Sequence, residues 1–315
     1  MEQRDWKGVF PAITTPFGAQ LAVDHQRLGN HVAWLIDSGC NGIVALGSLG
    51  EAATLRFEEK VSILETCRRA LGPDVPLVAG IAGLATSECV ALAERAAAVG
   101  CSALMVLPPY VYRGDWRETR AHYDAVIGAT KLSCMLYNNP IAYGTDVSPA
   151  QMVELSAHVN LHAVKESSGD VRRVTAIRET LGDRLVIFAG MDDAILESIP
   201  MGAVGWVAGL VNALPLESVR IVELARDGRM EEARALYEWF LPLLRLDTVP
   251  KFVQLIKLVQ AEVGQGSASV RPPRLELVGD ELAQVTALIR ERLACRPKFD
   301  AKKPAARGSL ASSVA

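Results

Sequence analysis

The chain has 315 residues, half of them hydrophobic, and a formal net charge of −3. This near-neutral balance, without basic clusters, argues against nucleic acid or an anionic membrane surface as a partner. No apolar run approaches the ~20 residues of a membrane span, and the first residues lack the basic start and long apolar stretch of a secretory signal. The six cysteines are scattered without a C-x-x-C pair, as in a cytosolic protein with reduced thiols. We therefore expect a cytoplasmic, globular protein with one large core.

Short apolar or β-branched runs alternate along the chain with segments of helical pattern. Most of the runs lack polar/apolar alternation, which is typical of parallel strands covered on both faces. The segments between them carry helix signals, such as Ser148 directly before Pro149. The predicted strands are Val9–Thr14, Gly42–Leu46, Leu77–Ile81, Ala103–Leu107, Ser133–Tyr137, Leu161–Lys165, Leu185–Ala189 and Ala203–Ala208.

Eight successive β-then-α units match a closed (β/α)8 barrel in size and count. A doubly wound open sheet is the alternative fold. It would usually carry a Gly-rich phosphate-binding turn after the first strand, and here that position reads Thr14-Thr15-Pro16-Phe17. We therefore favour the barrel and assign it to residues 1–228.

The pattern becomes purely helical after Pro215. The first of these helices would be the eighth helix of the barrel, and the other three would form a C-terminal helical extension, residues 229–295. Such an extension could cover the barrel or build a subunit contact. The tail, residues 296–315, lacks apolar content and is predicted to be disordered. The helical segments are Leu216–Asp227, Met230–Leu244, Thr248–Val263 and Asp280–Ala294.

The chemistry of such a barrel is found at the carboxyl ends of its strands, where the loops converge. Lys165 stands at such an end, directly behind the apolar run Leu161–Val164. Burial favours the neutral amine, which is a nucleophile that can condense with a 2-oxo group. The alternative is a lysine that extends to solvent or pairs with Glu166. The residues alone leave the two interpretations open.

Two other strand ends carry groups that suit amine catalysis. Tyr137 could move protons around a lysine imine, although it could also be an aromatic residue packed under Pro140. The turn Gly47-Ser48-Leu49-Gly50 could present backbone N–H groups and the Ser48 hydroxyl to a carboxylate, or it could be an ordinary turn between strand and helix. The strand ends offer no metal-ligand set and no His-centred triad.

Acidic residues at two strand ends raise the question of a metal site. Asp192 and Asp193 lie where a helix is predicted to begin, and carboxylates are favoured there by the helix dipole. We therefore interpret both as helix-capping residues. Glu51 is the other acidic residue at a strand end.

Four motifs in chain order give the sequence a specific resemblance to the dihydrodipicolinate synthase / N-acetylneuraminate lyase family, over about residues 7–295. The resemblance implies a class I, Schiff-base (β/α)8 enzyme with no metal and no organic cofactor, assembled as a homotetramer built from dimers. It also implies that a small 2-oxo acid or 2-imino acid forms the imine. The motifs are Gly47-Ser48-Leu49-Gly50-Glu51, Tyr137-Asn138-Asn139-Pro140, Val164-Lys165-Glu166-Ser167-Ser168 and Gly190-Met191-Asp192.

The resemblance also implies roles for individual residues. Lys165 would be the imine-forming nucleophile, and Tyr137 would move protons for carbinolamine formation and for the later enamine step. The substrate-binding residues would be Ser48, Leu49, Thr14, Gly190 and Val207, with the Ser48–Leu49 turn holding the carboxylate of the 2-oxo acid.

Three positions depart from the pattern of the dihydrodipicolinate synthases. Leu49 replaces the second of two threonines, and Val111 stands where those enzymes have a tyrosine, donated across a subunit contact, that completes a proton relay. Ala142 replaces an arginine that binds the carboxylate of their second substrate. Alanine cannot supply the charge-assisted hydrogen bonds of an arginine. Lysine biosynthesis is therefore not the function that we expect.

The stretches YNNPIAYGTDV, GWVAGLVNALP and PLLRLDTVPKFVQLIKL look most similar to 1-pyrroline-4-hydroxy-2-carboxylate deaminases of hydroxyproline catabolism. Our hypothesis is therefore deamination of that cyclic imine to 2-oxoglutarate semialdehyde and ammonia. A 2-oxo acid aldolase or a 2-keto-3-deoxy acid dehydratase is the alternative, because fold and lysine alone do not separate these reactions. A non-catalytic small-molecule binder on the same barrel also stays open, since Leu49 and Val111 favour it.

Overall fold

All eight barrel strands are short, apolar and parallel to their neighbours. The computed structural model describes residues 1–298, and in it the strands pair in the order β1-β8-β7-β6-β5-β4-β3-β2. An isolated parallel bridge between Ala12 and Val44 joins β1 to β2 and closes the barrel, which confirms the (β/α)8 prediction over the doubly wound sheet. The strands are β1 Gly8–Pro11, β2 Ile43–Ala45, β3 Leu77–Ile81, β4 Ala103–Val106, β5 Ser133–Asn138, β6 Leu161–Glu166, β7 Val186–Ala189 and β8 Gly205–Ala208.

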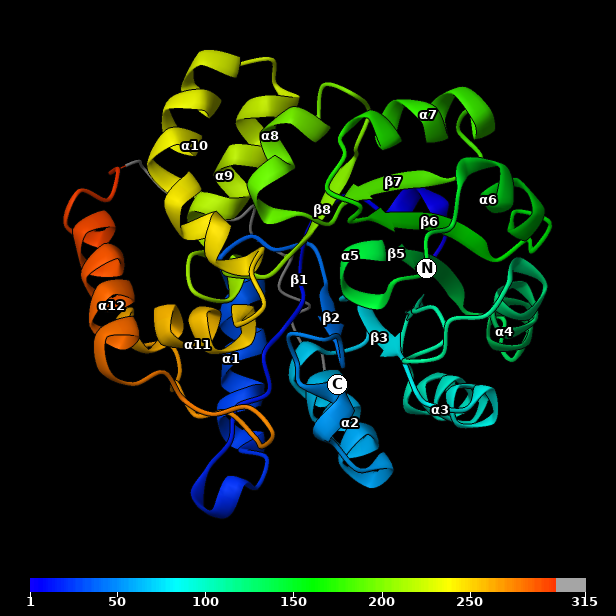
Figure 1. The fold of residues 1–315 in the computed structure, drawn as a ribbon, viewed down its shortest axis with the longest axis horizontal. Helices are drawn as coiled ribbons and strands as arrows, with labels where there is room; N and C mark the ends of the chain where they lie inside the picture. The colour runs from blue at the N-terminus through cyan, green and yellow to red at the C-terminus, as the bar shows by residue number, and fades with distance from the viewer. Residues whose placement is uncertain (299–315) are drawn as a thin grey trace, which may run out of the picture.

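Helices surround the strands, as Figure 1 shows. The helices of the barrel are α1 His25–Asp37, α2 Phe57–Leu71, α3 Thr86–Val99, α4 Trp116–Gly128, α5 Pro140–Tyr143, α6 Pro149–Leu155, α7 Arg172–Leu181, α8 Ile195–Ser198 and α9 Pro215–Arg226. Short 3-10 turns lie at η1 Gln3–Asp5, η2 Ala19–Leu21, η3 Ala52–Thr54, η4 Asp192–Ala194, η5 Leu210–Asn212 and η6 Arg245–Asp247. Within residues 1–298, no helix has both the length and the apolar character needed to cross a membrane.

Three helices follow the barrel and form the extension, α10 Met230–Leu244, α11 Phe252–Glu262 and α12 Gly279–Ala294. They lie together on one side of the barrel, with α11 next to α1 (Figure 1). The predicted segment Thr248–Val263 corresponds to α11, which begins four residues later, at Phe252. The prediction was wrong at this end because Val249 precedes Pro250, and a residue before proline is disfavoured in the α conformation. The division after residue 228 stays a proposal. The predicted disordered tail, 296–315, lies outside the described residues from position 299 onward.

An aromatic layer fills the amino-terminal end of the barrel. The rings of Trp6, Phe10 and Phe188 lie 5.6–5.8 Å apart between centroids, and the Trp6 indole donates a hydrogen bond of 2.8 Å to Ser133 Oγ. Buried aromatic rings of this kind contribute strongly to core stability. Because this end is plugged, the interior is open to chemistry only at the carboxyl ends of the strands.

Buried polar bonds attach the extension to those carboxyl ends. Glu51, in the turn after β2, forms an ion pair of 2.5 Å with Lys257 of α11, and both side chains are almost fully buried. The Glu51 carboxylate also accepts the backbone N–H of Arg271 at 2.9 Å. The turn after β2 is therefore fixed from outside by the last third of the chain.

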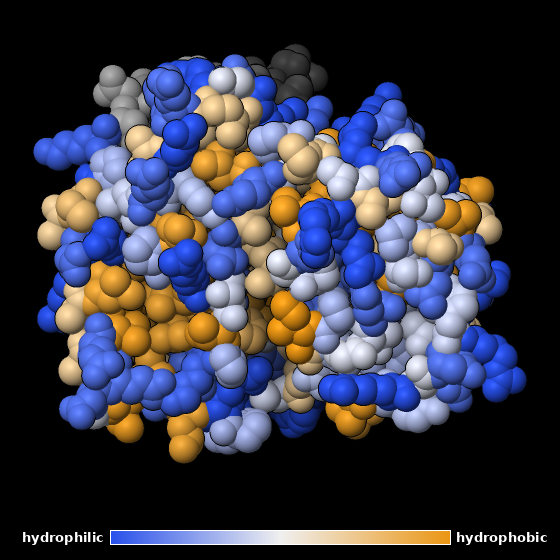
Figure 2. All heavy atoms as spheres, turned by 45° about the horizontal axis from the view of Figure 1, so that its top comes forward, coloured by the Kyte–Doolittle hydropathy of each residue, from blue (hydrophilic) through white to orange (hydrophobic). Residues whose placement is uncertain are grey.

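The outer surface differs in character between the two parts. Figure 2 shows apolar side chains gathered toward the left of the view, on the side of the extension in Figure 1, while polar side chains cover most of the remaining face. A groove between α11 and α12 is lined by apolar residues that include Leu258, Leu277 and Leu282.

Candidate active site

Lys165 lies inside the barrel, near the carboxyl end of β6. It pairs with Tyr137 of β5 and Phe188 of β7, and it faces the same side of its strand as Ala163, which belongs to the interior core. The residue is only 6% exposed, and its Nζ lies 4.2 Å from the centroid of the Tyr137 ring. The lysine therefore does not extend to solvent.

Glu166 points away from Lys165, as alternation along a strand requires. Its carboxylate accepts hydrogen bonds from Asn138 Nδ2 at 3.0 Å and from the Ser168 backbone N–H at 2.6 Å. Among residues 1–298 no ion pair joins Lys165 to Glu166. Lys165 is therefore not paired with Glu166, which was the other part of the alternative interpretation.

Gly190 provides the space through which the Lys165 side chain runs. A methyl group added at position 190 would overlap Ser167 Oγ and would lie 2.9 Å from both Cγ and Cε of Lys165. Only glycine leaves room for that approach. Whether Gly190 also contacts a substrate, as predicted, stays a prediction.

Tyr137 turns its phenol toward a second tyrosine as well as toward the lysine. The Tyr137 hydroxyl accepts a hydrogen bond of 3.0 Å from Asn139 Nδ2. The rings of Tyr137 and Tyr143 meet edge to face at 5.6 Å between centroids, and the Tyr143 hydroxyl is hydrogen-bonded to Ser48 Oγ. Lys165 and three hydroxyl groups from β5, α5 and the turn after β2 are thus brought together.

Sequence reasoning missed Tyr143. It ends α5, a single helical turn that Asn139 caps by accepting the Ala142 N–H at 2.9 Å. Gly144 follows in the left-handed conformation, with φ 70°, and ends the turn there. The Asn-Pro start and the glycine four residues after Pro140 were signals for this turn, but nothing local indicated which way the phenol would point.

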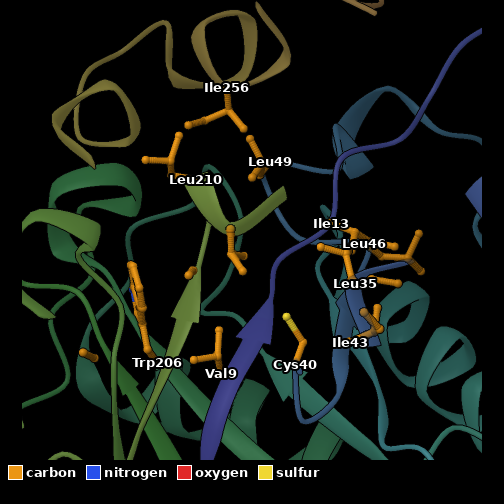
Figure 3. Packing of buried hydrophobic residues seen from close by; sticks show 14 of the residues in the cluster. Val9, Ile13, Leu35, Cys40, Ile43, Leu46, Leu49, Trp206, Leu210 and Ile256 are labelled. Atoms are coloured by element: carbon orange, nitrogen blue, oxygen red, sulfur yellow. The ribbon is translucent and has the colours of Figure 1, made fainter. Parts of the chain in front are cut away.

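The turn after β2 directs its leucine side chain toward the extension (Figure 3). Leu49 is buried, and in Figure 3 its side chain points toward Leu210 and Ile256, which come from η5 and α11. Among the described residues, the backbone N–H groups of Ser48 and Leu49 have no hydrogen-bond acceptor. Two adjacent free N–H groups form a suitable receptor for a carboxylate. Leu49 can therefore contribute its backbone to a site without contributing its side chain.

The two remaining predicted substrate-binding residues are buried. The Thr14 hydroxyl donates a hydrogen bond of 2.9 Å to Gln260 Oε1 of the extension, and the Thr14 N–H donates to Asn212. Val207 belongs to the interior core together with Tyr137. The structure thus assigns the Thr14 hydroxyl a protein partner, and contacts of these two residues with a substrate stay predictions.

Asp192 is not the capping residue that the sequence suggested. Its buried carboxylate accepts hydrogen bonds from Trp206 Nε1 at 3.0 Å and from the backbone N–H groups of Gly209 and Leu210, at the end of β8. Burial raises the pKa of Asp192 to about 6, while these hydrogen bonds and the charge of Lys165 lower it. Its carboxylate therefore ties η4 to β8 instead of closing a helix.

Asp247 brings a second carboxyl from the extension to the same place. It lies against Gly209, and its Oδ1 is buried without a hydrogen-bond partner among residues 1–298. Burial, and then the neighbouring Asp192, raise the pKa of Asp247 well above its ordinary value, whereas the charge of Lys165 lowers it. The charge of Lys165 thus lowers the pKa of both carboxyl groups. Sequence reasoning had not connected Asp247 with the site.

This arrangement combines an enclosed amine, a phenol beside it and a pair of free N–H groups. Such a set can hold a small carboxylic acid while the amine attacks its neighbouring carbonyl or imine carbon.

One known protein family matches almost the whole chain. The sequence model of the dihydrodipicolinate synthetase family matches residues 5–292. The 4-hydroxy-tetrahydrodipicolinate synthase of Geotalea uraniireducens is 30% identical over 290 residues, which cover 91% of this chain and 98% of that protein. The enzyme of the same name from Haloarcula marismortui is 31% identical over 279 residues, covering 88% and 91%.

Solved structures of similar proteins have the same fold. Dihydrodipicolinate synthase DapA-2 of Bacillus anthracis superposes with a TM-score of 0.87 at 28% identity, covering 92% of this chain and 99% of that one. The Acinetobacter baumannii dihydrodipicolinate synthase, solved in complex with pyruvate, gives 0.86 at 27% identity and covers 91% and 98%.

Proposed function

The chain belongs to the dihydrodipicolinate synthetase family, and we propose that it is a lyase whose Lys165 forms an imine with a 2-oxo acid or a cyclic 2-imino acid. The observation that carries this proposal is the enclosed position of the Lys165 amine, 4.2 Å from the centre of the Tyr137 ring. An amine held inside the barrel is a nucleophile that can attack the carbonyl or imine carbon of a bound acid. The free N–H groups of Ser48 and Leu49 would hold the substrate carboxylate.

For the specific reaction we propose deamination of 1-pyrroline-4-hydroxy-2-carboxylate. Lys165 adds to C2 of the cyclic imine, and the C2–N1 bond of the resulting aminal then breaks, which leaves an imine on Lys165 and a free amine on C5. Loss of a C3 proton from this imine gives an enamine. The enamine electrons then expel the C4 hydroxyl as water, and hydrolysis releases ammonia and 2-oxoglutarate semialdehyde, with one water consumed overall. Tyr137, beside the amine, would move the protons of these steps.

The synthase reaction for which the relatives are named uses a second substrate. The residue at position 142, in helix α5, is unsuited to bind that substrate in this chain. The resemblance implies an arginine for the second substrate's carboxylate at position 142, where this chain has Ala142. The next residue, Tyr143, is buried and hydrogen-bonded to Ser48. An apolar methyl group cannot replace a bidentate guanidinium clamp, which supports a reaction with one acid substrate.

Ammonia release tests the specific reaction. Purified protein incubated with the pyrroline substrate should release ammonia and semialdehyde in equal amounts. Turnover of 4-hydroxy-2-oxoglutarate without ammonia would support the aldolase alternative. Formation of 4-hydroxy-tetrahydrodipicolinate would instead support the synthase reaction for which the relatives are named.

Borohydride trapping tests the broader proposal independently of the substrate. With pyruvate present, reduction should leave a covalent adduct on Lys165. A protein that binds pyruvate but gains no adduct would be the non-catalytic binder. We also propose a homotetramer built from dimers, which the resemblance implies, and sedimentation of the purified protein tests it. A cytoplasmic location is proposed from the six scattered cysteines.

A further inference from the structure

We propose that Tyr143 is a positioning residue that relays protons between Tyr137 and Ser48 within one subunit. The inference rests on the proposed function, because the relay serves the imine of Lys165. It goes beyond that function in assigning a role to a residue that no sequence motif indicated.

The contacts of Tyr143 connect the lysine to the surface of the barrel mouth. Its hydroxyl is hydrogen-bonded to Ser48 Oγ, and its ring meets the Tyr137 ring edge to face. Tyr137 in turn lies against the Lys165 amine. Of the three hydroxyl-bearing residues, Tyr137 and Tyr143 are buried, and Ser48 is partly exposed. Ser48 is therefore the member that can exchange protons with water.

One side chain fixes both tyrosines. Asn139 Nδ2 donates to the Tyr137 hydroxyl at 3.0 Å, and its Oδ1 accepts the N–H of Ala142, which closes the turn that carries Tyr143. Because the same amide holds the end of β5 and the start of α5, the two phenols keep a constant relation. A relay of this kind depends on such preorganisation.

The proton balance of imine formation fits this chain of hydroxyls. A neutral carbinolamine on Lys165 needs one proton to lose its C2 hydroxyl as water and become the protonated imine. Tyr137 gives that proton to the leaving oxygen and regains one from Tyr143. Tyr143 regains its proton from Ser48, and Ser48 takes one from solvent. Each residue thus ends with the protons that it had at the start.

The environment of Tyr143 favours transfer through neutral hydroxyl groups. Burial, together with the neighbouring Tyr137 phenol, raises the pKa of Tyr143 well above its ordinary value, and the hydrogen bond with Ser48 only partly lowers it. A phenol of this kind stays protonated and does not accumulate as phenolate. It can pass a proton on only while it receives another, which is how a relay works.

The variant Tyr143→Phe tests the relay because it removes only the hydroxyl. We expect kcat to fall about 100-fold, at the low end of the effect of general acid–base groups, while KM changes less than about threefold. The rate of borohydride-trapped adduct formation with pyruvate should fall in parallel, but its final extent should equal that of the unmodified protein.

Tyr110→Phe is the matched control. The Tyr110 ring lies 6.0 Å from that of Tyr143 between centroids, and its hydroxyl forms no hydrogen bond within residues 1–298. We expect this variant to retain both kcat and the trapping rate. A loss in Tyr110→Phe equal to that in Tyr143→Phe would show a packing effect and would overturn the relay.

The variant Ser48→Ala completes a double-mutant cycle and keeps the proposal testable if Tyr143→Phe folds poorly. Ser48→Ala should slow adduct formation by a similar factor. The double variant should be no slower than the slower single one, because both changes interrupt one path. Multiplied losses, or unchanged turnover in Tyr143→Phe, would overturn the relay alone. Failure of the unmodified protein to form any adduct would overturn the proposed function and the relay with it.

Discussion

The amine of Lys165 lies against the face of the Tyr137 ring, with Nζ 4.2 Å from the ring centroid. Strand pairing sets this distance, because Lys165 of β6 is in register with Tyr137 of β5. The face of an aromatic ring attracts the ammonium group of a lysine. The same residue thus holds the Lys165 side chain and carries the hydroxyl that we propose as its partner in proton transfer.

Replacement of the nucleophile should abolish chemistry without unfolding the protein. Lys165→Met keeps most of the side-chain volume and removes the amine, so turnover and the borohydride-trapped adduct should both be lost. Urea unfolding should show a midpoint no lower than that of the unmodified protein, since an apolar group replaces a buried cation. Lys131→Met, at an exposed lysine, is the control and should retain full activity. Substantial turnover in Lys165→Met would contradict the proposed mechanism.

Removal of the Tyr137 hydroxyl should slow proton transfer and leave the ring in place. We expect Tyr137→Phe to lower kcat by about 10²–10³-fold, which lies within the range of about 10²–10⁴-fold for a general acid–base group, with a smaller effect on KM. Stopped-flow kinetics with rapid borohydride quenching would measure adduct formation directly. An unchanged rate would mean that another group moves the protons.

An added methyl group at position 190 should displace the nucleophile. In Gly190→Ala the new Cβ overlaps Ser167 Oγ and lies 2.9 Å from Lys165 Cε, closer than carbon atoms approach in packed proteins. We expect adduct formation to fall at least about tenfold. Gly128→Ala is the matched control, because nothing lies within 4 Å of a methyl group added there. That variant should keep full activity and gain about 0.5–1 kcal/mol in the free energy of unfolding.

The buried ion pair between Glu51 and Lys257 should be sensitive to loss of one partner. Lys257→Met leaves the Glu51 carboxylate buried without its cation, and we expect the free energy of unfolding to fall by about 3–5 kcal/mol. Adding Glu51→Gln removes the orphaned charge, so the double variant should recover part of that loss. Urea denaturation monitored by circular dichroism measures both. Equal stability of the single and double variants would show that the charge of Glu51 is satisfied by other groups.

The ion pair of Glu59 with Arg271 should make stability depend on acidic pH. The hydrogen bond from Arg271 lowers the pKa of Glu59 from its ordinary 4.5 to about 2 in the folded protein. The contribution of this pair is therefore fully present above about pH 4.5 and disappears as the pH falls toward 2. Glu59→Gln should cost about 1–2 kcal/mol at pH 7. Thermal unfolding curves of the two proteins should converge between pH 5 and pH 2; a constant gap would contradict this account.

The strands could be predicted from the sequence because their signals are local. Each is a short apolar segment between polar turns, and all eight predictions overlap the observed strands. The position of Lys165 followed from the same pattern, since a charged residue at the end of such a segment is conspicuous. Local patterns thus predicted the barrel and the residue at its mouth.

The remaining site residues depend on contacts between distant segments. Tyr143 meets Ser48 across 95 residues of chain, and Asp247 reaches the end of β8 only because η6 docks there. Asp192 has the sequence context of a helix start, yet its carboxylate accepts a hydrogen bond from Trp206 of β8. In each case the role of the side chain depends on a residue that is distant in the sequence. The local pattern could therefore not predict it, and only the contacts of the folded chain show it.

The bond between Glu51 and Lys257 also has a consequence for how the protein is made. The two residues are separated by 206 positions. A nascent chain that has been synthesised as far as β8 therefore still lacks Lys257, the cation that pairs with Glu51 in the turn after β2. A product terminated at that point would contain every strand of the barrel but would bury an unpaired carboxylate under its binding turn. Completion of the catalytic face is therefore a late event of biosynthesis, which follows the appearance of α11.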